Sequence, residues 1–209
     1  MMYNLSNTAD LIFLKDTLQV KFKYPNLYRP KLKIDGYKEQ SLSIITMEDP
    51  NTVTLGIWGM LPQNFDGSWK KFQRLKNTLH VNKNDIYKNI LFKEALLKRR
   101  CLIIVTGFYT HYLSEDGITD YLVEKETLKP FYLAGIYNVL DDGFITCTVI
   151  NTEVNESLKS VNNLYEVMPL QIPKIFKSIW LDKNSTQKAI DHIISKPYIT
   201  KFKIQKIIS

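Results

Sequence analysis

The chain has 209 residues, of which 44% are hydrophobic and 23% charged, a composition typical of globular proteins. Its formal net charge is +7, and no apolar run approaches the ~20 residues that cross a bilayer. The two cysteines, Cys101 and Cys147, provide neither a disulfide framework nor the spacing of a metal site. We therefore expect a soluble, cytoplasmic protein of one domain, residues 1–209, with no cofactor, no metal ion and no membrane partner.

The first quarter of the chain predicts a helix, a loop and two strands. Leucines recur at helical spacing in residues 8–19, with Thr8 as the expected N-cap. Prolines and a glycine interrupt residues 24–40 and predict a loop. Ser41–Met47 and Thr52–Trp58 predict strands, since both are short apolar stretches joined by turn residues.

The centre of the chain is rich in strand patterns. A short basic helix is predicted at Trp69–Lys76 and a longer helix at Asp85–Arg99. Four apolar stretches separated by turn residues then predict strands: Cys101–Tyr109, Thr119–Glu124, Phe131–Val139 and Phe144–Asn151. Apolar strands joined by hairpin-type turns favour an antiparallel sheet that curls into a barrel.

The last third of the chain predicts further short elements around that sheet. They are a helix near Glu153–Val161, a strand at Met168–Ile172, a helix from Pro173 to about Leu181, a helix at Ser185–Ser195 capped by Ser185, and a closing strand at Tyr198–Ile208. The predicted fold class is α+β, with a curled antiparallel sheet or barrel core and peripheral helices.

Positive charge clusters between residues 15 and 38, where six lysines and one arginine alternate with aromatic residues. Cations interleaved with aromatic rings suit a single strand, because the phosphates need positive charge and the bases need stacking surfaces. A solvated face above core aromatics has the same composition, and the pattern alone does not separate the two.

Several short motifs follow one another at characteristic distances. They are Trp-Gly-x-x-Pro from Trp58 to Pro62, an Asn-rooted loop at Asn77-Thr78-Leu79, Arg-Cys-Leu leading into Gly-Phe-Tyr between Arg100 and Tyr109, Pro-Phe-x-x-Ala-Gly from Pro130 to Gly135, Thr152 with Asn155, and Met168-Pro169. In order and spacing these motifs make the chain resemble the SOS response-associated peptidase family, also called abasic-site-processing proteins. The resemblance is strongest over residues 1–181.

This resemblance implies a compact α+β fold around a barrel, with a positively charged DNA groove. In the family, a cysteine at the second position becomes the N-terminus, and its amine and thiol close a thiazolidine ring on the aldehyde of an abasic site in single-stranded DNA. A Glu after Gly-Phe-Tyr and a His before Met-Pro handle protons, and an Asn positions the substrate.

The sequence departs from that pattern at three of these four positions. Met2 stands in place of the cysteine, and a thioether cannot close the ring. Thr110 stands in place of the Glu, and Tyr165 in place of the His. Neither a hydroxyl nor a phenol transfers protons readily near pH 7. Asn77 alone matches the family, which favours a fold that has lost its main reaction.

Neighbouring histidines do not obviously replace the missing groups. Successive side chains on a strand point to opposite faces, so we expect His111 to face away from the pocket if Thr110 faces into it. His80 lies in the Asn77 loop, where a surface or loop role is the simpler interpretation.

The sequence thus predicts a pseudoenzyme that binds single-stranded or abasic DNA without a crosslink. The expected DNA-binding residues are Trp58, Asn77, Arg100, Lys31, Lys33 and Arg74. Two alternatives remain: an abasic-site lyase that works through an amine, and a decayed paralogue or interaction scaffold with no role at DNA. The sequence does not predict whether catalysis remains, or the oligomeric state.

Overall fold

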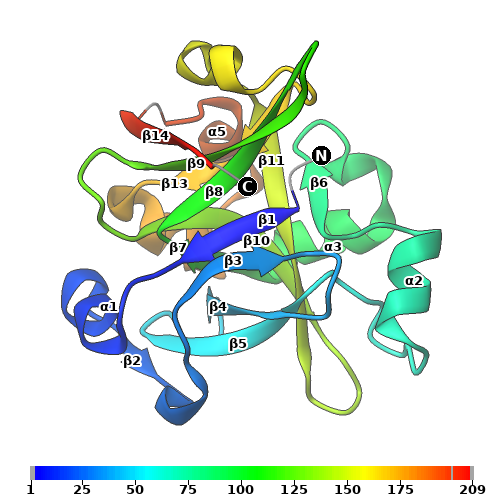
Figure 1. Ribbon diagram of the computed structural model, residues 1–209. Coiled ribbons are helices and arrows are strands. Elements are labelled where there is room, and N and C mark those ends of the chain that lie inside the picture. The colour runs from blue at the N-terminus through cyan, green and yellow to red at the C-terminus, as the bar shows by residue number, and fades with distance from the viewer. Residues whose placement is uncertain (1–2, 199, 208–209) are drawn as a thin grey trace.

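The computed structural model describes residues 3–198 and 200–207 (Figure 1). Its strands are β1 (Asn4–Asn7), β2 (Lys21–Phe22), β3 (Lys31–Asp35), β4 (Ser41–Thr46), β5 (Thr52–Trp58), β6 (His80–Asn82), β7 (Arg100–Val105), β8 (Gly107–Ser114), β9 (Gly117–Lys125), β10 (Phe131–Val139), β11 (Ile145–Glu153), β12 (Val167–Pro169), β13 (Gln171–Ile172) and β14 (Phe202–Lys206).

The helices lie around these strands. The α-helices are α1 (Leu11–Leu18), α2 (Trp69–Leu75), α3 (Ile90–Lys98), α4 (Lys177–Leu181) and α5 (Gln187–Ser195), and the 3-10 helices are η1 (Pro25–Leu27), η2 (Ile86–Lys88), η3 (Glu156–Val161) and η4 (Lys174–Phe176). None of the helices in the described part of the chain is long and apolar enough to span a bilayer.

Two curled sheets form the centre of the molecule (Figure 1). The first has the strand order β14-β9-β8-β1-β3, and the second has the order β12-β11-β10-β7-β4-β5-β2. A parallel pairing of β5 with β11 joins distant strands of the second sheet, so this sheet closes on itself. The predicted α+β class with a curled, mainly antiparallel core is confirmed.

The two faces of the second sheet belong to different hydrophobic clusters. Ile103 and Leu133 face the first sheet together with Leu5 and Phe108. Their strand neighbours point to the opposite face and pack against α1, α3, α4 and α5. Strands buried on both faces read as continuous apolar runs rather than alternating ones, which explains the patterns between residues 101 and 151.

The inner face of the closed sheet has little spare room. At Gly135 a Cβ atom would lie 2.8 Å from the Sγ atom of Cys101, closer than packed atoms approach. Cys101 and Cys147 are both fully buried in this core. They are small apolar side chains in this sheet, as the sequence predicts.

Several predicted boundaries need correction. The predicted strand Cys101–Tyr109 is two strands, because the chain crosses from the second sheet to the first at Thr106. The amide of Thr106 donates to Ser6 O at 2.8 Å, and its hydroxyl lies 3.0 Å from the Thr8 amide that donates to it. An uninterrupted apolar sequence carries no sign of this crossing.

The region predicted as a loop, residues 24–40, contains η1 and β3. β3 forms because it pairs antiparallel with β1, a long-range contact that local sequence does not encode. The predicted strand Met168–Ile172 is likewise divided into β12 and β13, which pair with different strands.

Helix ends also differ from the predictions. α1 is capped by Asp10, whose carboxylate accepts from the Phe13 amide at 2.8 Å, instead of by Thr8. α5 is capped by Thr186 instead of Ser185. The predicted helix Asp85–Arg99 is interrupted at Asn89, which caps α3 by accepting from Leu91 N.

The remaining helix and strand predictions fall close to the observed elements. The region near Glu153–Val161 is the 3-10 helix η3. The helix predicted from Pro173 is η4 followed by α4, and β14 is the closing strand predicted at Tyr198–Ile208. β14 pairs antiparallel with β9 at the edge of the first sheet.

Arg100 fastens the start of β7 to two helix ends. Its side chain is 1% exposed, and its guanidinium donates to four backbone carbonyls, those of Trp180 at 2.7 Å, Leu96 at 2.8 Å, Leu97 at 3.1 Å and Asp182 at 2.7 Å. Burial lowers the pKa of Arg100 from its ordinary value, while the Asp182 carboxylate raises it. The positive charge of Arg100 is thus stabilised by backbone carbonyl dipoles at the ends of α3 and α4.

We predict that Arg100→Leu lowers the free energy of unfolding by about 3–5 kcal/mol, because several buried carbonyls lose a charged donor. The matched control is Lys98→Gln on the exposed face of α3, which should change it by less than about 0.5 kcal/mol. Urea denaturation of both variants measures the difference. Equal midpoints for the two would show that the carbonyl contacts of Arg100 contribute nothing.

Candidate functional site

The candidate site lies where β1 begins, beside β6 and β8 (Figure 1). β1 pairs with β8 through Leu5 opposite Phe108 and Ser6 opposite Gly107. Extending this antiparallel register by two residues brings Tyr3 opposite Thr110. Tyr3 is held from the other side as well, because its carbonyl accepts from the Gly36 amide at 2.6 Å.

Two aromatic rings, those of Tyr37 and His80, pack against the ring of Tyr3 in tilted arrangements. The Tyr3 ring centroid lies 4.2 Å from that of Tyr37 and 5.3 Å from that of His80. The Asn77 side-chain amide donates to the Tyr3 hydroxyl at 3.4 Å. The described start of the chain is therefore in contact with the loop that carries the family asparagine.

Trp58 positions that loop. Its indole N–H donates to Leu79 O at 2.6 Å, and its carbonyl accepts from the Trp69 indole at 2.9 Å. Gly59, next in the chain, has a φ of +108°, and a Cβ atom there would lie 2.7 Å from Gln73 Nε2 and Trp69 Nε1. Trp58 and Gly59 thus hold α2 and the Asn77 loop against the end of β5.

The Asn77 loop is also held by Thr78. The Thr78 hydroxyl donates to Met60 O at 2.6 Å, and the side-chain amide of Gln73 bonds both its amide and its hydroxyl. Thr148 donates to the Thr78 carbonyl. Asn77 Oδ1 accepts from the Leu79 amide at 3.1 Å. That last bond sets the direction of the Asn77 side chain.

Thr110 occupies the inner side of β8. It is 2% exposed, and its hydroxyl is buried with no hydrogen-bond partner among residues 3–198 and 200–207. His111 points the other way, and its Nδ1 atom lies 2.7 Å from Asp120 Oδ1 on β9. The prediction that His111 faces away from the Thr110 side is supported by this pairing.

His80 is the imidazole packed against Tyr3. Burial lowers the pKa of His80 to about 4. The ring is therefore neutral near pH 7. Predicted as a surface or loop residue, it is instead half-buried and begins β6, which pairs with β11. Its ring contacts Tyr3, so we assign it a structural role beside the start of β1.

A cavity of about 630 Å³ adjoins Asn77. It is lined by side chains from α2 and from the turns on either side, namely Gly36, Tyr37, Trp69, Lys70, Gln73, Arg74, Leu75, Asn77 and Leu79. Lys70 and Arg74 supply positive charge, none of the described residues that line the cavity is an Asp or a Glu, and Tyr37 is 63% exposed. We call this the α2 cavity.

The other predicted positions lie around this centre. Tyr165 is half-buried in the segment between η3 and β12. Its neighbour Asn163 bonds Leu113 on β8 in both directions, at 2.7 and 2.9 Å. That segment therefore lies beside the strand that carries Thr110. Met2 lies outside the described residues.

Two predicted DNA-binding residues are corrected by their burial. Trp58 and Arg100 are each 1% exposed, and their polar groups are bonded to backbone atoms. A buried side chain whose hydrogen-bond donors are already satisfied does not contact a DNA strand directly. Both residues therefore position other elements of the protein. Arg74 lies in the α2 cavity, and a DNA contact there stays a prediction.

Lys31 and Lys33 are exposed on β3, away from the α2 cavity lining. The Lys31 ammonium bonds Gln40 Oε1 at 2.5 Å. That of Lys33 lies 3.6 Å from Asp120 and 5.5 Å from the Tyr109 ring centroid. Their role at DNA stays a prediction.

Thr152 and Asn155 flank an ionic cluster at the end of β11. Glu153 Oε2 lies 2.5 Å from the Lys83 ammonium and accepts from Thr152 Oγ1 at 3.0 Å. The hydrogen bond from Lys83 lowers the pKa of Glu153 to about 2. In the described ranges, no group of three His, Cys, Asp or Glu side chains is placed to hold a metal ion.

Sequence reasoning missed Tyr3 and Gln73 as parts of the site, and it included Tyr37 only as one of the aromatic residues between residues 15 and 38. Gln73 lies on the same helix as Arg74, and this proximity was a usable signal. The contact between Tyr3 and Tyr37 had no signal, because it joins β1 to the turn after β3, and β3 itself was not predicted.

Comparison with known proteins places this geometry in a family. The model of the family described as SOS response associated peptidase (SRAP) matches residues 3–209. Abasic site processing protein YoaM of Bacillus subtilis (strain 168) is 23% identical over 177 residues, which cover 82% of this chain and 74% of that protein.

Solved structures share the fold. A crystal structure of a Bacteroides thetaiotaomicron protein superposes with a TM-score of 0.87 at 21% identity, and covers 99% of this chain and 92% of its own. A crystal structure from Bordetella bronchiseptica superposes with a TM-score of 0.78 at 12% identity, over 99% of this chain and 100% of its own.

We predict that His80 makes stability depend on pH. Its pKa is about 4 in the folded protein and about 6.5 when unfolded, so the unfolded chain binds a proton first. The contribution is present above pH 6.5 and is lost as the pH falls toward 4, by about 3 kcal/mol at most. The loss of stability between pH 7.5 and 4.5, measured by urea denaturation, should be smaller in His80→Gln. The same loss in both proteins would contradict the assignment.

Proposed function

The chain belongs to the SOS response associated peptidase (SRAP) family, and on that basis we propose that it binds an abasic site in single-stranded DNA without forming a permanent crosslink. The observation that carries the proposal is the α2 cavity, which joins positive charge and an exposed aromatic ring to the family asparagine.

The α2 cavity fits a single strand. Lys70 and Arg74 are placed for phosphate oxygens, and the exposed ring of Tyr37 offers a face on which a base can stack. Aromatic stacking and cationic contacts together are the usual means of holding unpaired nucleic acid.

Asn77 lines the α2 cavity and also contacts Tyr3. Its Oδ1 atom is committed to the Leu79 amide. Its amide reaches Tyr3 only at 3.4 Å, a long contact that a sugar or phosphate oxygen can replace at little cost. The buried Thr110 hydroxyl has no hydrogen-bond partner among the described residues, and it can act both as a donor and as an acceptor toward a sugar that enters beside it.

The same geometry explains why the bound strand would not be crosslinked. Thiazolidine formation needs a thiol beside the attacking amine. Cys101 and Cys147 are fully buried in the barrel core, and burial raises the pKa of both thiols. Thr110 lacks the acid–base capacity of a glutamate. The imidazole of His80 packs against Tyr3, and burial lowers its pKa to about 4.

The contribution of positive charge to DNA affinity can be measured by salt titration. Binding of a fluorescent abasic oligonucleotide should weaken steeply with salt, since phosphate contacts release counterions. Arg74→Gln should flatten the slope of log K against log [salt] by about 0.7. Lys188→Gln, on the exposed face of α5, is the matched control and should leave the slope unchanged. A flat salt dependence in the unaltered protein would overturn the proposal.

Covalent chemistry is tested separately with the same oligonucleotide. We expect no adduct that survives denaturing electrophoresis or appears in intact-mass spectra. We also expect no product trapped by borohydride above a basic control protein. A stable adduct would mean that the family reaction persists by another group. A borohydride-dependent adduct with strand cleavage would instead establish an amine-based lyase.

A further inference from the structure

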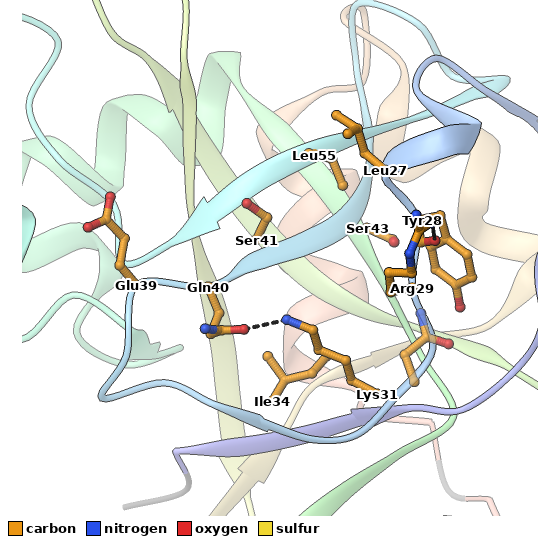
Figure 2. Close-up of a pocket in the computed structure, with 11 residues that line it drawn as sticks. Leu27, Tyr28, Arg29, Lys31, Ile34, Glu39, Gln40, Ser41, Ser43 and Leu55 are labelled. Atoms are coloured by element: carbon orange, nitrogen blue, oxygen red, sulfur yellow. Dashed lines mark hydrogen bonds between the residues drawn. The ribbon is translucent and has the colours of Figure 1, made fainter.

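A second cavity lies at the seam between the two sheets, and it has no part in the proposed DNA site. β3 is an edge strand of the first sheet and has no partner strand on its far side among the described residues. The cavity opens between β3 and the β4–β5 pair, with a volume of about 420 Å³. Volumes of this size are typical of small-molecule sites. We call it the seam cavity (Figure 2).

The walls of the seam cavity are apolar on the η1 and β5 sides. Leu27 and Leu55 line this part, and Ile34 contributes from β3. Leu27 is 63% exposed, so an apolar ligand surface placed against it would remove apolar area from water.

One of the residues that line the seam cavity, Asn7, carries an unsatisfied polar atom. Asn7 is 4% exposed, and its amide N–H donates to Ile104 O at 3.3 Å. That bond fixes the orientation of the side chain, so Oδ1 remains as an acceptor, buried without a partner among the described residues. Leaving a buried acceptor unpaired costs about 1–3 kcal/mol. A ligand that enters here should therefore carry a hydrogen-bond donor.

The mouth of the seam cavity carries two cations without a carboxylate partner. Neither Arg29 nor Lys31 is part of an ion pair in the described ranges. The Arg29 guanidinium bonds two carbonyls through Nη1 alone, which leaves its other nitrogens for a ligand. Figure 2 shows Lys31 extending toward Gln40, and the Glu39 carboxylate directed away from both cations.

We propose that the seam cavity is a second binding site, which takes a nucleoside monophosphate. Its phosphate would lie between Arg29 and Lys31, where charge-assisted hydrogen bonds are strongest. Its base would lie between Leu27 and Leu55, with a ring N–H donated to Asn7 Oδ1. Thymine, whose N3–H is a ring donor, meets this requirement and serves as the probe base.

The seam cavity is separated from the Asn77 pocket by the length of β1. Tyr3 and Asn7 stand at opposite ends of that strand, about 13 Å apart at ~3.3 Å per residue. A nucleotide in the seam cavity is therefore either a free monophosphate or a distal unit of a longer strand. The two sources share the same contacts.

Calorimetric titration with thymidine 5′-monophosphate tests the site directly. We expect saturable binding with a Kd below about 1 mM, and at least tenfold weaker binding of thymidine, which lacks the phosphate. The N3-methylated monophosphate, which lacks the donor for Asn7, should also bind at least tenfold more weakly. Equal affinities for all three, or no saturation at several millimolar, would overturn the proposal.

Variants locate the binding. Arg29→Gln and Lys31→Gln alter exposed side chains and should each weaken binding about tenfold, and Leu55→Trp should abolish it by filling the cavity. Lys188→Gln is the control. Unchanged affinity in both Arg29→Gln and Lys31→Gln would place the nucleotide elsewhere and refute the assignment, whether or not Leu55→Trp folds.

A competition experiment separates the two sources of the nucleotide and keeps the two proposals independent. If a saturating single-stranded oligonucleotide displaces the monophosphate, the seam cavity takes a unit of the strand. If both bind together, it takes a free nucleotide. Arg74→Gln should weaken only the oligonucleotide, so failure of the DNA proposal leaves this result readable.

Discussion

The hydrogen bond from the Trp58 indole to Leu79 O is the contact on which the candidate site depends. It joins the end of β5, in the closed sheet, to the loop that carries Asn77. The Trp69 indole on α2 donates to the Trp58 carbonyl, and Gly59 allows the two to approach. Asn77, Arg74 and Tyr37 therefore converge because one buried indole fixes two otherwise separate segments.

The proposal combines a fixed scaffold with altered chemistry. The groups that position the site are buried and hydrogen-bonded, as Arg100 and Thr78 show. Where the resemblance implies a cysteine that forms the covalent bond, the sequence has Met2, and where it implies a glutamate and a histidine that carry protons, it has Thr110 and Tyr165. Binding needs only surface and charge, whereas crosslinking needs a particular thiol and amine, so the two properties can be lost separately.

The closure of the second sheet also explains where the molecule leaves space. Inside the closed sheet, packing is close enough that Gly135 has no room for a Cβ atom. The first sheet ends at β3 without joining β4, and the seam cavity lies at this gap. The seam cavity thus lies at the edge of the first sheet, whereas the α2 cavity lies between α2 and the neighbouring turns.

The sequence by itself determined the composition of the core, most of the strands and the family landmarks. Trp58, Asn77 and Arg74 stand out in the sequence alone, because motif order and helix charge are local properties. Only the tertiary structure decided that Trp58 and Arg100 are structural, that Thr106 marks a change of sheet, and that Tyr3 and Tyr37 belong to the site. These facts depend on pairings between residues far apart in the chain, such as β1 with β3 and β8, and local propensity contains no information about which distant strand becomes a neighbour.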